Sequence, residues 1–156
     1  MENIEIEKKW LVERFPDDLS RFDCLEIEQG YLSTSPTVRI RKENDDYYLT
    51  YKSSKDMPEG SVLSHEEYNL PLTRDSYAHL LSKCDGRLIS KKRYLIPLRN
   101  DLTAELDIFE GVFSPLMIVE VEFETEEAAL SFEAPDWFGP DVTGDPKYRN
   151  AVMAYS

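Results

Sequence analysis

The chain has 156 residues, and its 31 Asp and Glu residues outnumber its 18 Lys and Arg residues, which gives a formal net charge of −13. A hydrophobic fraction of 41% with 12% aromatic residues is ordinary for one globular domain and too high for a disordered acidic tail. The acidic balance argues against an outer surface that binds nucleic acid or an anionic membrane, because both need a basic footprint.

The start of the chain and its cysteines indicate the compartment. Residues 1–10 contain three glutamates and no apolar core, so no signal peptide is expected. No apolar stretch approaches the roughly 20 residues of a membrane helix. Cys24 and Cys84 are interpreted as buried thiols, because no secretion signal or regular spacing accompanies them. We therefore expect a cytoplasmic protein with a single domain over residues 1–156, whose oligomeric state, a homodimer included, stays open.

Alternation of apolar and polar residues with period 2 predicts about eight strands along the chain. They cover residues 4–12, 25–32, 37–42, 47–52, 64–70, 88–96, 103–109 and 117–124. Turn residues at 33–36, 44–46 and 55–61 separate several of them at intervals that suit an antiparallel meander. Eight is the number of strands at which a closed sheet can enclose one small ligand.

The predicted helices are few and peripheral. They cover residues 73–83, 125–132 and 145–155, and they begin at the capping residues Thr73, Thr125 and Asp145. Pro146 directly after Asp145 suits the first position of a helix. The expected fold class is α+β, with an eight-stranded antiparallel β-barrel and a few helices around it.

Charged residues recur two positions apart on the predicted strands, opposite apolar residues. The basic set comprises Lys9, Arg39, Arg41, Lys52, Lys91 and Arg93, and the acidic set comprises Glu5, Glu7, Glu67, Glu105, Asp107, Glu120 and Glu122. One such strand is typical of a solvated face over an apolar core. The joint pattern instead indicates apolar faces that pack outward and charged faces that line a lumen. Six cations against seven carboxylates make this lining nearly neutral, which leaves about −12 on the rest of the chain.

A lumen with this lining needs an occupant. Burying unpaired charges costs several kcal/mol each, so the lumen must hold water, ions or a charged ligand. Six cations suit the oxygens of a polyphosphate, and carboxylate oxygens suit Mg²⁺ or Mn²⁺. Carboxylates, guanidinium groups and a divalent metal together are the equipment of phosphoryl transfer.

These segments resemble a known family. Glu5-Ile6-Glu7-Lys8-Lys9 resembles the Glu-x-Glu-x-Lys motif of the CYTH superfamily, also called triphosphate tunnel metalloenzymes. The ordered set that follows fits as well: Val38-Arg39-Ile40-Arg41, Tyr51-Lys52-Ser53, Lys91-Lys92-Arg93-Tyr94, Glu105-Leu106-Asp107 and Val119-Glu120-Val121-Glu122-Phe123. The resemblance spans nearly the whole chain, and its length and ending are most similar to the short bacterial tripolyphosphatase-like members.

The resemblance implies an eight-stranded tunnel that cleaves a triphosphate with a divalent metal, most simply inorganic tripolyphosphate. By position it implies metal binding by Glu5, Glu7, Asp107, Glu120 and Glu122. It implies phosphate binding by Lys9, Arg39, Arg41, Lys52, Lys91 and Arg93. Glu5, Glu7, Lys9, Glu120 and Glu122 are the residues expected to take part in catalysis.

One departure from the family pattern is visible. Where relatives often have Arg ahead of Glu-x-Glu, this chain has His65, Glu67 and Asn69. The missing carboxylate at position 69 bears on a second metal site and on the choice of substrate.

Three other functions stay open at this point: a class IV adenylate cyclase, a thiamine or nucleoside triphosphatase, and a polyphosphate-binding module without activity. The first two need a stacking face, for which Tyr47, Tyr48, Tyr51, Trp10 and Trp137 are available, although such aromatic residues are more often core. A zinc site is not expected, because His65 and His79 are too few and too far apart. A glycosidase would not need six inward cations. Lys147 and Arg149 either close one mouth of the tunnel or are solvated.

Overall fold

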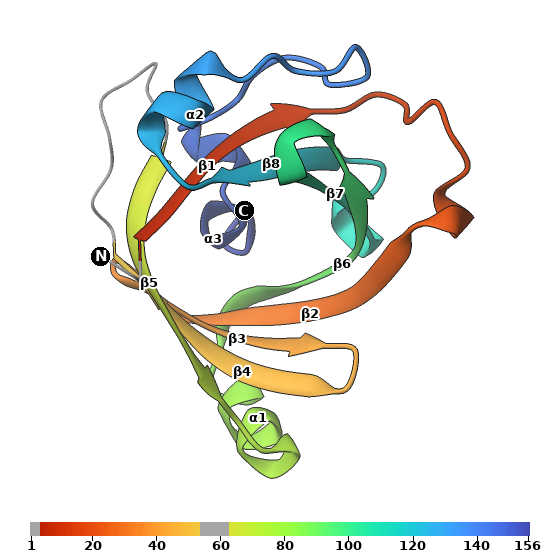
Figure 1. Ribbon diagram of the computed structural model, residues 1–156. Coiled ribbons are helices and arrows are strands. Elements are labelled where there is room, and N and C mark those ends of the chain that lie inside the picture. The colour runs from red at the N-terminus through yellow and green to blue at the C-terminus, as the bar shows by residue number, and fades with distance from the viewer. Residues whose placement is uncertain (1–3, 54–62) are drawn as a thin grey trace.

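The computed structural model describes the backbone of residues 4–53 and 63–156, and its side chains apart from those of residues 63–65 (Figure 1). Its strands are β1 Ile4–Leu11, β2 Asp23–Thr34, β3 Thr37–Glu43, β4 Asp46–Lys52, β5 Leu63–Pro71, β6 Asp85–Pro97, β7 Thr103–Phe109 and β8 Met117–Phe123. Its α-helices are α1 Arg74–Leu81, α2 Glu126–Ser131 and α3 Asn150–Met153. Each predicted strand is present with ends that differ by three residues or fewer, and the turn predicted at 55–61 lies outside the described residues.

The described strands form a closed barrel in the order β1-β5-β4-β3-β2-β6-β7-β8, and all neighbours are antiparallel. The expected barrel is therefore confirmed. The expected meander holds for β2 to β5 and for β6 to β8 but is wrong at two points. β1 pairs with β5 and β8 instead of β2, and α1 lies between β5 and β6, so β6 returns to pair with β2.

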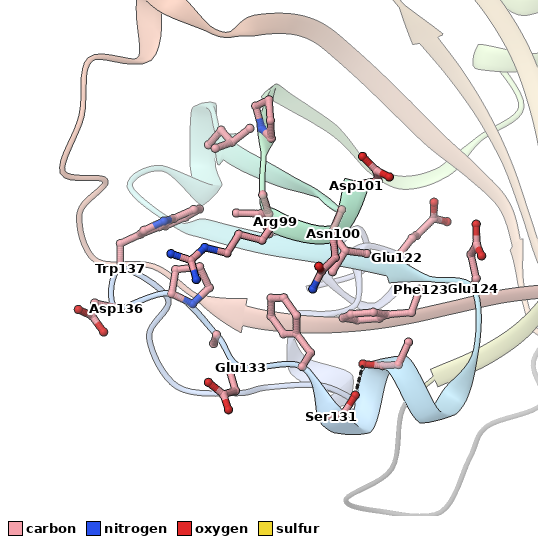
Figure 2. A pocket seen from close by; sticks show the side chains of 18 of the residues that line it. Arg99, Asn100, Asp101, Glu122, Phe123, Glu124, Ser131, Glu133, Asp136 and Trp137 are labelled. Carbon is pink, nitrogen blue, oxygen red and sulfur yellow. Dashed lines mark hydrogen bonds between the residues drawn. The ribbon is translucent and has the colours of Figure 1, made fainter.

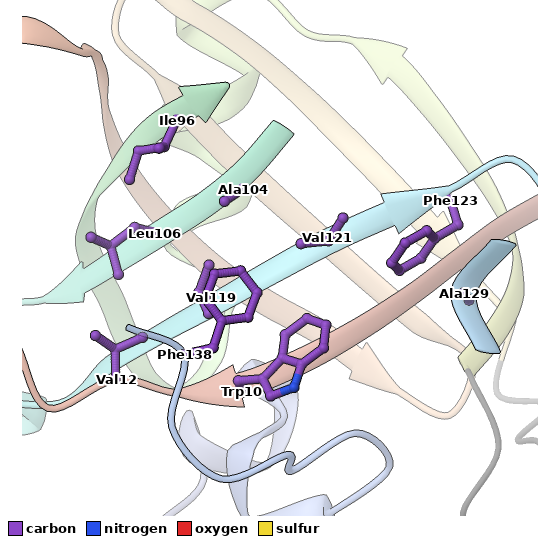
Figure 3. Close-up of a cluster of buried hydrophobic side chains, with 10 residues drawn as sticks. All are labelled: Trp10, Val12, Ile96, Ala104, Leu106, Val119, Val121, Phe123, Ala129 and Phe138. Carbon is purple, nitrogen blue, oxygen red and sulfur yellow. The ribbon is translucent and has the colours of Figure 1, made fainter. Parts of the chain in front are cut away.

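The apolar faces of the strands point outward, as predicted, and several are covered by the chain that follows β8. Trp10 of β1 and Val119 of β8 pack with Phe138 and with Ala129 of α2 in a cluster on the outside of the barrel (Figure 3). The ring centroids of Trp10 and Phe138 are 4.7 Å apart. These contacts lie outside the strands and leave the inner faces of β1, β7 and β8 largely to charged side chains. At one end of the barrel the lining is apolar instead: Tyr31, Ile89, Phe109 and Ile118, which alternate in register with Gln29, Lys91, Asp107 and Glu120, pack with Met153 and Ala154 of the C-terminal segment.

Two of the predicted helix starts are confirmed by their capping bonds. The Thr73 hydroxyl accepts from the backbone N–H of Ser76, whose own hydroxyl accepts from the backbone N–H of Thr73. Thr125 caps α2 by accepting from the N–H of Ala128. Each cap satisfies donors that the first turn of a helix leaves without an internal partner.

The last predicted helix is wrong in part. Asp145 caps as expected and Pro146 follows it, but only the 3₁₀ turn Pro146–Tyr148 forms there. Arg149 is extended at φ −80° and ψ 131°, and α3 begins only at Asn150. This break has a consequence for the site, since it turns the Tyr148 carbonyl and the Asn150 side chain toward the barrel.

Cys24 and Cys84 are free thiols and are only partly buried. Across the described residues, no helix has both the length and the apolarity that a bilayer crossing demands.

Candidate active site

The structure places the predicted charged residues inside the barrel. Glu7, Lys9, Arg41, Lys91, Arg93, Asp107 and Glu120 are each at most 9% exposed. Glu5, Arg39, Lys52, Glu67 and Glu105 are half-buried, and Glu122 is exposed. So many buried charges in one interior are uncommon, because each must be compensated by partners.

The lining divides into two walls by charge. The acidic wall comprises Glu5 and Glu7 on β1, Glu120 and Glu122 on β8, and Glu105 on β7. The basic wall comprises Arg39 and Arg41 on β3 with Lys91 and Arg93 on β6, on either side of β2. The two walls thus place anionic and cationic side chains around one shared space.

Like charges face each other directly within the acidic wall. Glu7 lies opposite Glu122 in the β1–β8 register, and Glu105 lies opposite Glu120 in the β7–β8 register. Directly opposed like charges destabilise a sheet. Such an arrangement is stable only where protons or cations offset the repulsion.

The pKa values of the acidic wall are strongly perturbed. Burial, then the neighbouring Glu120 and Glu5, raise the pKa of Glu7 well above its usual range. Partial desolvation at the mouth of the barrel, then a hydrogen bond with Glu5, raise the pKa of Glu122 to about 8. Burial also acts on Glu120, but Lys9 and the hydrogen bond with Glu7 outweigh it and hold the pKa of Glu120 well below its usual value. The raised pKa values of Glu7 and Glu122 favour their protonated forms, and a bound cation would compete with those protons.

The basic wall is organised around Asp107. Its Oδ1 accepts from Arg93 Nε at 2.7 Å, and its Oδ2 accepts from Arg93 Nη2 at 2.9 Å and lies 2.8 Å from Lys91 Nζ. Burial, against the attraction of Asp107, lowers the pKa of Lys91 to about 7. Both oxygens of Asp107 are thus engaged by cations of the basic wall.

Lys52 lies at the contact between the acidic wall and β5. Its Nζ is 2.8 Å from Glu5 Oε1 and 3.5 Å from Glu67 Oε2. Burial opposes the charge of Lys52, but Glu7 and Glu5 outweigh it and raise its pKa. Lys52, which the sequence grouped with phosphate-binding cations, is therefore paired with carboxylates here.

Asn69, where the family pattern has a carboxylate, forms hydrogen bonds in the structure without carrying a charge. Asn69 accepts from the Thr50 hydroxyl at 2.6 Å and donates to Glu67 Oε1 at 3.1 Å. The backbone of His65 pairs with Glu5, while its side chain lies outside the described residues. Asn69 thus orders Glu67 without adding a charge.

The C-terminal segment meets the lumen at one end. Lys9 Nζ donates to the Tyr148 carbonyl at 3.0 Å, and Lys91 Nζ donates to Asn150 Oδ1 at 2.8 Å. Figure 1 looks along the barrel and shows α3 and the C-terminus within its outline. Lys147, which the sequence placed at a mouth or in solvent, is exposed and lies 5.5 Å from the centroid of the Tyr148 ring.

Sequence patterns missed the neutral residues of this end. Gln29 on β2 is fully buried and contacts both Arg41 and Asn150. It escaped notice because Ile27 and Tyr31 share its face, so the inward face of β2 resembles an ordinary apolar one. The signal available was the single amide between two apolar residues on that face.

The opposite end of the barrel opens into a pocket of about 1600 Å³. Figure 2 shows it between the β6–β7 hairpin with Arg99 and Asp101, the end of β8 with Glu122, and the segment after α2 with Trp137. The pocket also reaches Glu5, so it adjoins the acidic wall.

The aromatic residues considered as a stacking face lie in different parts of the structure. Trp10 belongs to the outer hydrophobic cluster, and Tyr51 is exposed on the outer face. Tyr48 is inside, where its hydroxyl donates to Glu43 at 2.6 Å and accepts from Arg41 at 3.3 Å. Trp137 packs edge-on against Phe15 at 4.8 Å and lines the pocket, so it is the candidate closest to a ligand-accessible space.

The acidic wall suits a divalent cation by its chemistry. Its donors are hard carboxylate oxygens on neighbouring strands, which are the ligands that Mg²⁺ and Mn²⁺ prefer. Within the described residues no three His, Cys, Asp or Glu side chains are already arranged as a closed metal site. The crowding of carboxyls in this wall, with Glu7 hydrogen-bonded to Glu120 and Glu5 to Glu122, is what a bound cation would relieve.

This chain is similar to a known domain family and to two known proteins. Residues 3–138 match the CYTH domain. An inorganic triphosphatase of Nitrosomonas europaea is 41% identical over 155 residues, which is 97% of this chain and 97% of that protein. An inorganic triphosphatase of Acetivibrio thermocellus is 35% identical over 151 residues, 96% of this chain and 92% of that protein.

Solved structures give the same picture for the fold. The crystal structure of an inorganic triphosphatase superposes with a TM-score of 0.70 at 37% identity and covers 97% of this chain and 95% of its own. A Hippeastrum protein described as a putative adenylyl cyclase with a dominant triphosphatase activity shares the fold alone, with a TM-score of 0.60 at 19% identity over 81% of this chain and 82% of its own. With its barrel, its two charged walls and a family match over most of its length, the chain belongs to the CYTH domain family.

Proposed function

We propose that this protein is a hydrolase that cleaves inorganic tripolyphosphate inside its barrel with the help of Mg²⁺ or Mn²⁺. The observation that carries the proposal is the division of one lumen into an acidic and a basic wall. Two relatives that cover nearly the whole chain are inorganic triphosphatases, which supports the same substrate class.

The basic wall is the part that would hold the substrate. Arg39, Arg41, Lys91 and Arg93 present guanidinium and ammonium donors that match phosphate oxygens, and Lys9 adds one from β1. Among the described residues no hydrogen-bond partner reaches the buried Nε of Arg39. A phosphate oxygen would satisfy that donor, because a buried cationic donor without a partner is costly.

Glu5, Glu7, Glu120 and Glu122 are the proposed metal ligands. A divalent ion bound by them would lower the pKa of an attacking water and neutralise phosphate oxygens. Lys9, opposite Glu120 in the sheet, lies where it can steady charge on the transferred phosphoryl group.

Asp107 and Lys52 take different proposed roles from those that the family resemblance implies. Asp107 has both oxygens on Arg93 and Lys91, which supports a role as their counter-ion. Glu105, which faces Glu120 and has a pKa raised by burial, is better placed to join the metal ligands. The proposed role of Lys52 is to hold Glu5 and Glu67 in position, and not to bind phosphate directly.

An organic triphosphate is a second candidate substrate, and one observation favours it. The pocket at the open end brings Trp137, Phe15 and Phe132 beside Glu5 and Glu122, so a ring could stack there while its phosphates enter the barrel. The acidic side chains around the pocket, Asp17, Asp101, Glu124, Glu133 and Asp136, outnumber its arginines Arg21 and Arg99.

The test is a panel of substrates and metals on the purified chain. Tripolyphosphate, ATP, thiamine triphosphate and pyrophosphate are compared with Mg²⁺, with Mn²⁺ and with excess chelator, and phosphate release is measured. We expect metal-dependent release with the highest kcat/KM for tripolyphosphate. Higher kcat/KM for an organic triphosphate would favour the second candidate, and binding without phosphate release under any metal would make the protein a binding module.

A further inference from the structure

Two neutral amides connect the cations of the basic wall to the C-terminal segment. Arg41 Nε donates to Gln29 Oε1 at 2.9 Å, and Gln29 Nε2 donates to Asn150 Oδ1 at 3.2 Å and to the Tyr31 hydroxyl at 2.9 Å. Lys91 Nζ donates to the same Asn150 oxygen at 2.8 Å. A continuous chain of hydrogen bonds therefore runs from Arg41 to Lys91 through Gln29 and Asn150.

The direction of each amide in this chain is fixed by the cations at its ends. Guanidinium and ammonium groups only donate, so Gln29 must turn its oxygen to Arg41 and Asn150 must turn its oxygen to Lys91. The nitrogen of Gln29 is then left to donate to Asn150. Gln29 is 0% exposed, so its side chain is shielded from bulk water.

The amides orient the two cations without cancelling their charge. A carboxylate in the same place would also accept the bonds, as Asp107 does for Lys91 and Arg93, but it would offset the charge that a phosphate must meet. Arg41 has as its nearest described carboxylate Glu43, at 3.7 Å. Arg41 thus keeps most of its charge for a ligand.

We propose that Gln29 and Asn150 are positioning residues for phosphate binding, which set the spacing of Arg41 and Lys91 for neighbouring phosphate oxygens without adding a second negative charge beside them. Asn150 is the first residue of α3, so the position of the C-terminal segment would affect the geometry of the binding site. The inference rests on the proposed function for its substrate but concerns binding alone.

The decisive variant is Asn150→Asp. Aspartate can accept from Lys91 and from Gln29 just as asparagine does, so a purely structural role predicts an equally stable chain with unchanged binding. The proposal predicts unchanged or higher thermal stability together with about a tenfold weaker Kd for tripolyphosphate, because a second carboxylate then joins Asp107 beside Lys91. Binding is measured by titration calorimetry with tripolyphosphate and no divalent metal. Binding as tight as in the wild type would overturn the proposal.

A double-mutant cycle tests whether the amide acts through the cation. Asn150→Ala should weaken tripolyphosphate binding about tenfold in the wild-type chain and less than twofold in the Lys91→Met background, because the cation that it positions is already gone. Additive effects would contradict the proposal. Val152→Ala, an exposed position on the same helix, is the matched control and should leave the Kd unchanged.

The same titrations separate this inference from the proposed function. A wild-type chain that binds tripolyphosphate but releases no phosphate with any metal refutes the hydrolase and leaves the positioning role standing. A wild-type chain that hydrolyses tripolyphosphate while Asn150→Asp binds it equally well refutes the positioning role alone. A wild-type chain that shows neither binding nor hydrolysis refutes both.

Discussion

Glu7 and Glu120 belong to different strands yet share one hydrogen bond in the lumen, and their pKa values move in opposite directions. Burial raises the pKa of Glu7 with help from Glu120, while Lys9 and the hydrogen bond from Glu7 keep Glu120 ionised. A pair with opposite shifts is frequent at functional sites. We expect the proposed metal to bind the carboxyl groups of Glu7 and Glu120 and to displace the proton that they share.

Removing either carboxylate should therefore impair turnover. We expect Glu7→Gln and Glu120→Gln each to lower kcat for tripolyphosphate by about 10² or more, since each removes a proposed metal ligand. Phosphate release under saturating substrate and metal measures the effect. Glu13→Gln, an exposed carboxyl outside the barrel lumen, is the matched control and should be neutral. Near wild-type turnover in both lumen variants would argue against these roles.

Asp107 offers a test of counter-ion against metal ligand. Asp107→Asn leaves Arg93 and Lys91 without the carboxylate that now pairs with both. If Asp107 is a counter-ion, the variant should lose about 3–5 kcal/mol of unfolding free energy, because it leaves buried charges uncompensated. The metal concentration for half-maximal activity should stay unchanged. A rise of tenfold or more in that concentration, with stability retained, would restore Asp107 to the metal ligands.

At the scale of elements, alternation predicted the strands and which of their faces carry charge. It succeeded because each inward charge on β1, β7 and β8 has an apolar neighbour that packs outside. It failed on β2, where Ile27 and Tyr31 share the lumen face with Gln29. Local sequence also cannot specify strand order, since the β1–β5 and β2–β6 pairings join segments far apart in the chain.

The break in the last helix shows a second limit of local pattern. Asp145 and Pro146 are good starting residues, and nothing after them in the sequence forbids a continuous helix. The extended Arg149 instead lets the carbonyl of Tyr148 reach Lys9 and the amide of Asn150 reach Lys91. The helix is thus interrupted at the residue where its neighbours form hydrogen bonds to Lys9 and Lys91, so tertiary contacts override local helix propensity.

Helix α1 allows a prediction that separates stability from activity. Thr73 caps it in a reciprocal pair with Ser76, and α1 contacts the barrel at β3 and β4. We expect Thr73→Ala to lower the free energy of unfolding by about 1 kcal/mol, because the first turn loses a hydrogen-bond acceptor. Urea denaturation should show a lower midpoint with an unchanged slope, while kcat/KM stays within about twofold of wild type. A large drop in kcat/KM without denaturant, where the variant is folded, would show that α1 contributes to the site.

At the scale of the whole molecule, apolar packing outside the barrel lies back to back with unfavourable charge inside it. The Trp10 cluster packs on the outer face of β1, β7 and β8, the same strands whose inner faces form the acidic wall (Figure 3). Apolar burial on one face thus offsets like-charge repulsion on the other. The net charge of −13 adds a general repulsion to this local one.

A divalent cation should therefore raise the stability of the entire fold. At a concentration about 100 times its Kd, binding to the folded chain alone contributes about 2.7 kcal/mol, which for a domain of this size corresponds to roughly 5–10 °C in Tm. We expect Mg²⁺ or Mn²⁺ to produce this rise and chelator to reverse it, in thermal unfolding without substrate. Sodium chloride at matched ionic strength should produce a much smaller rise, because screening alone leaves the carboxylates of the acidic wall uncoordinated. In the double variant Glu120→Gln, Glu122→Gln most of the rise should vanish, since the repulsion that the cation relieves is then already gone. Equal shifts in the wild type and the double variant would show that the cation acts elsewhere on the acidic surface, and the acidic wall would lose its role as the metal site.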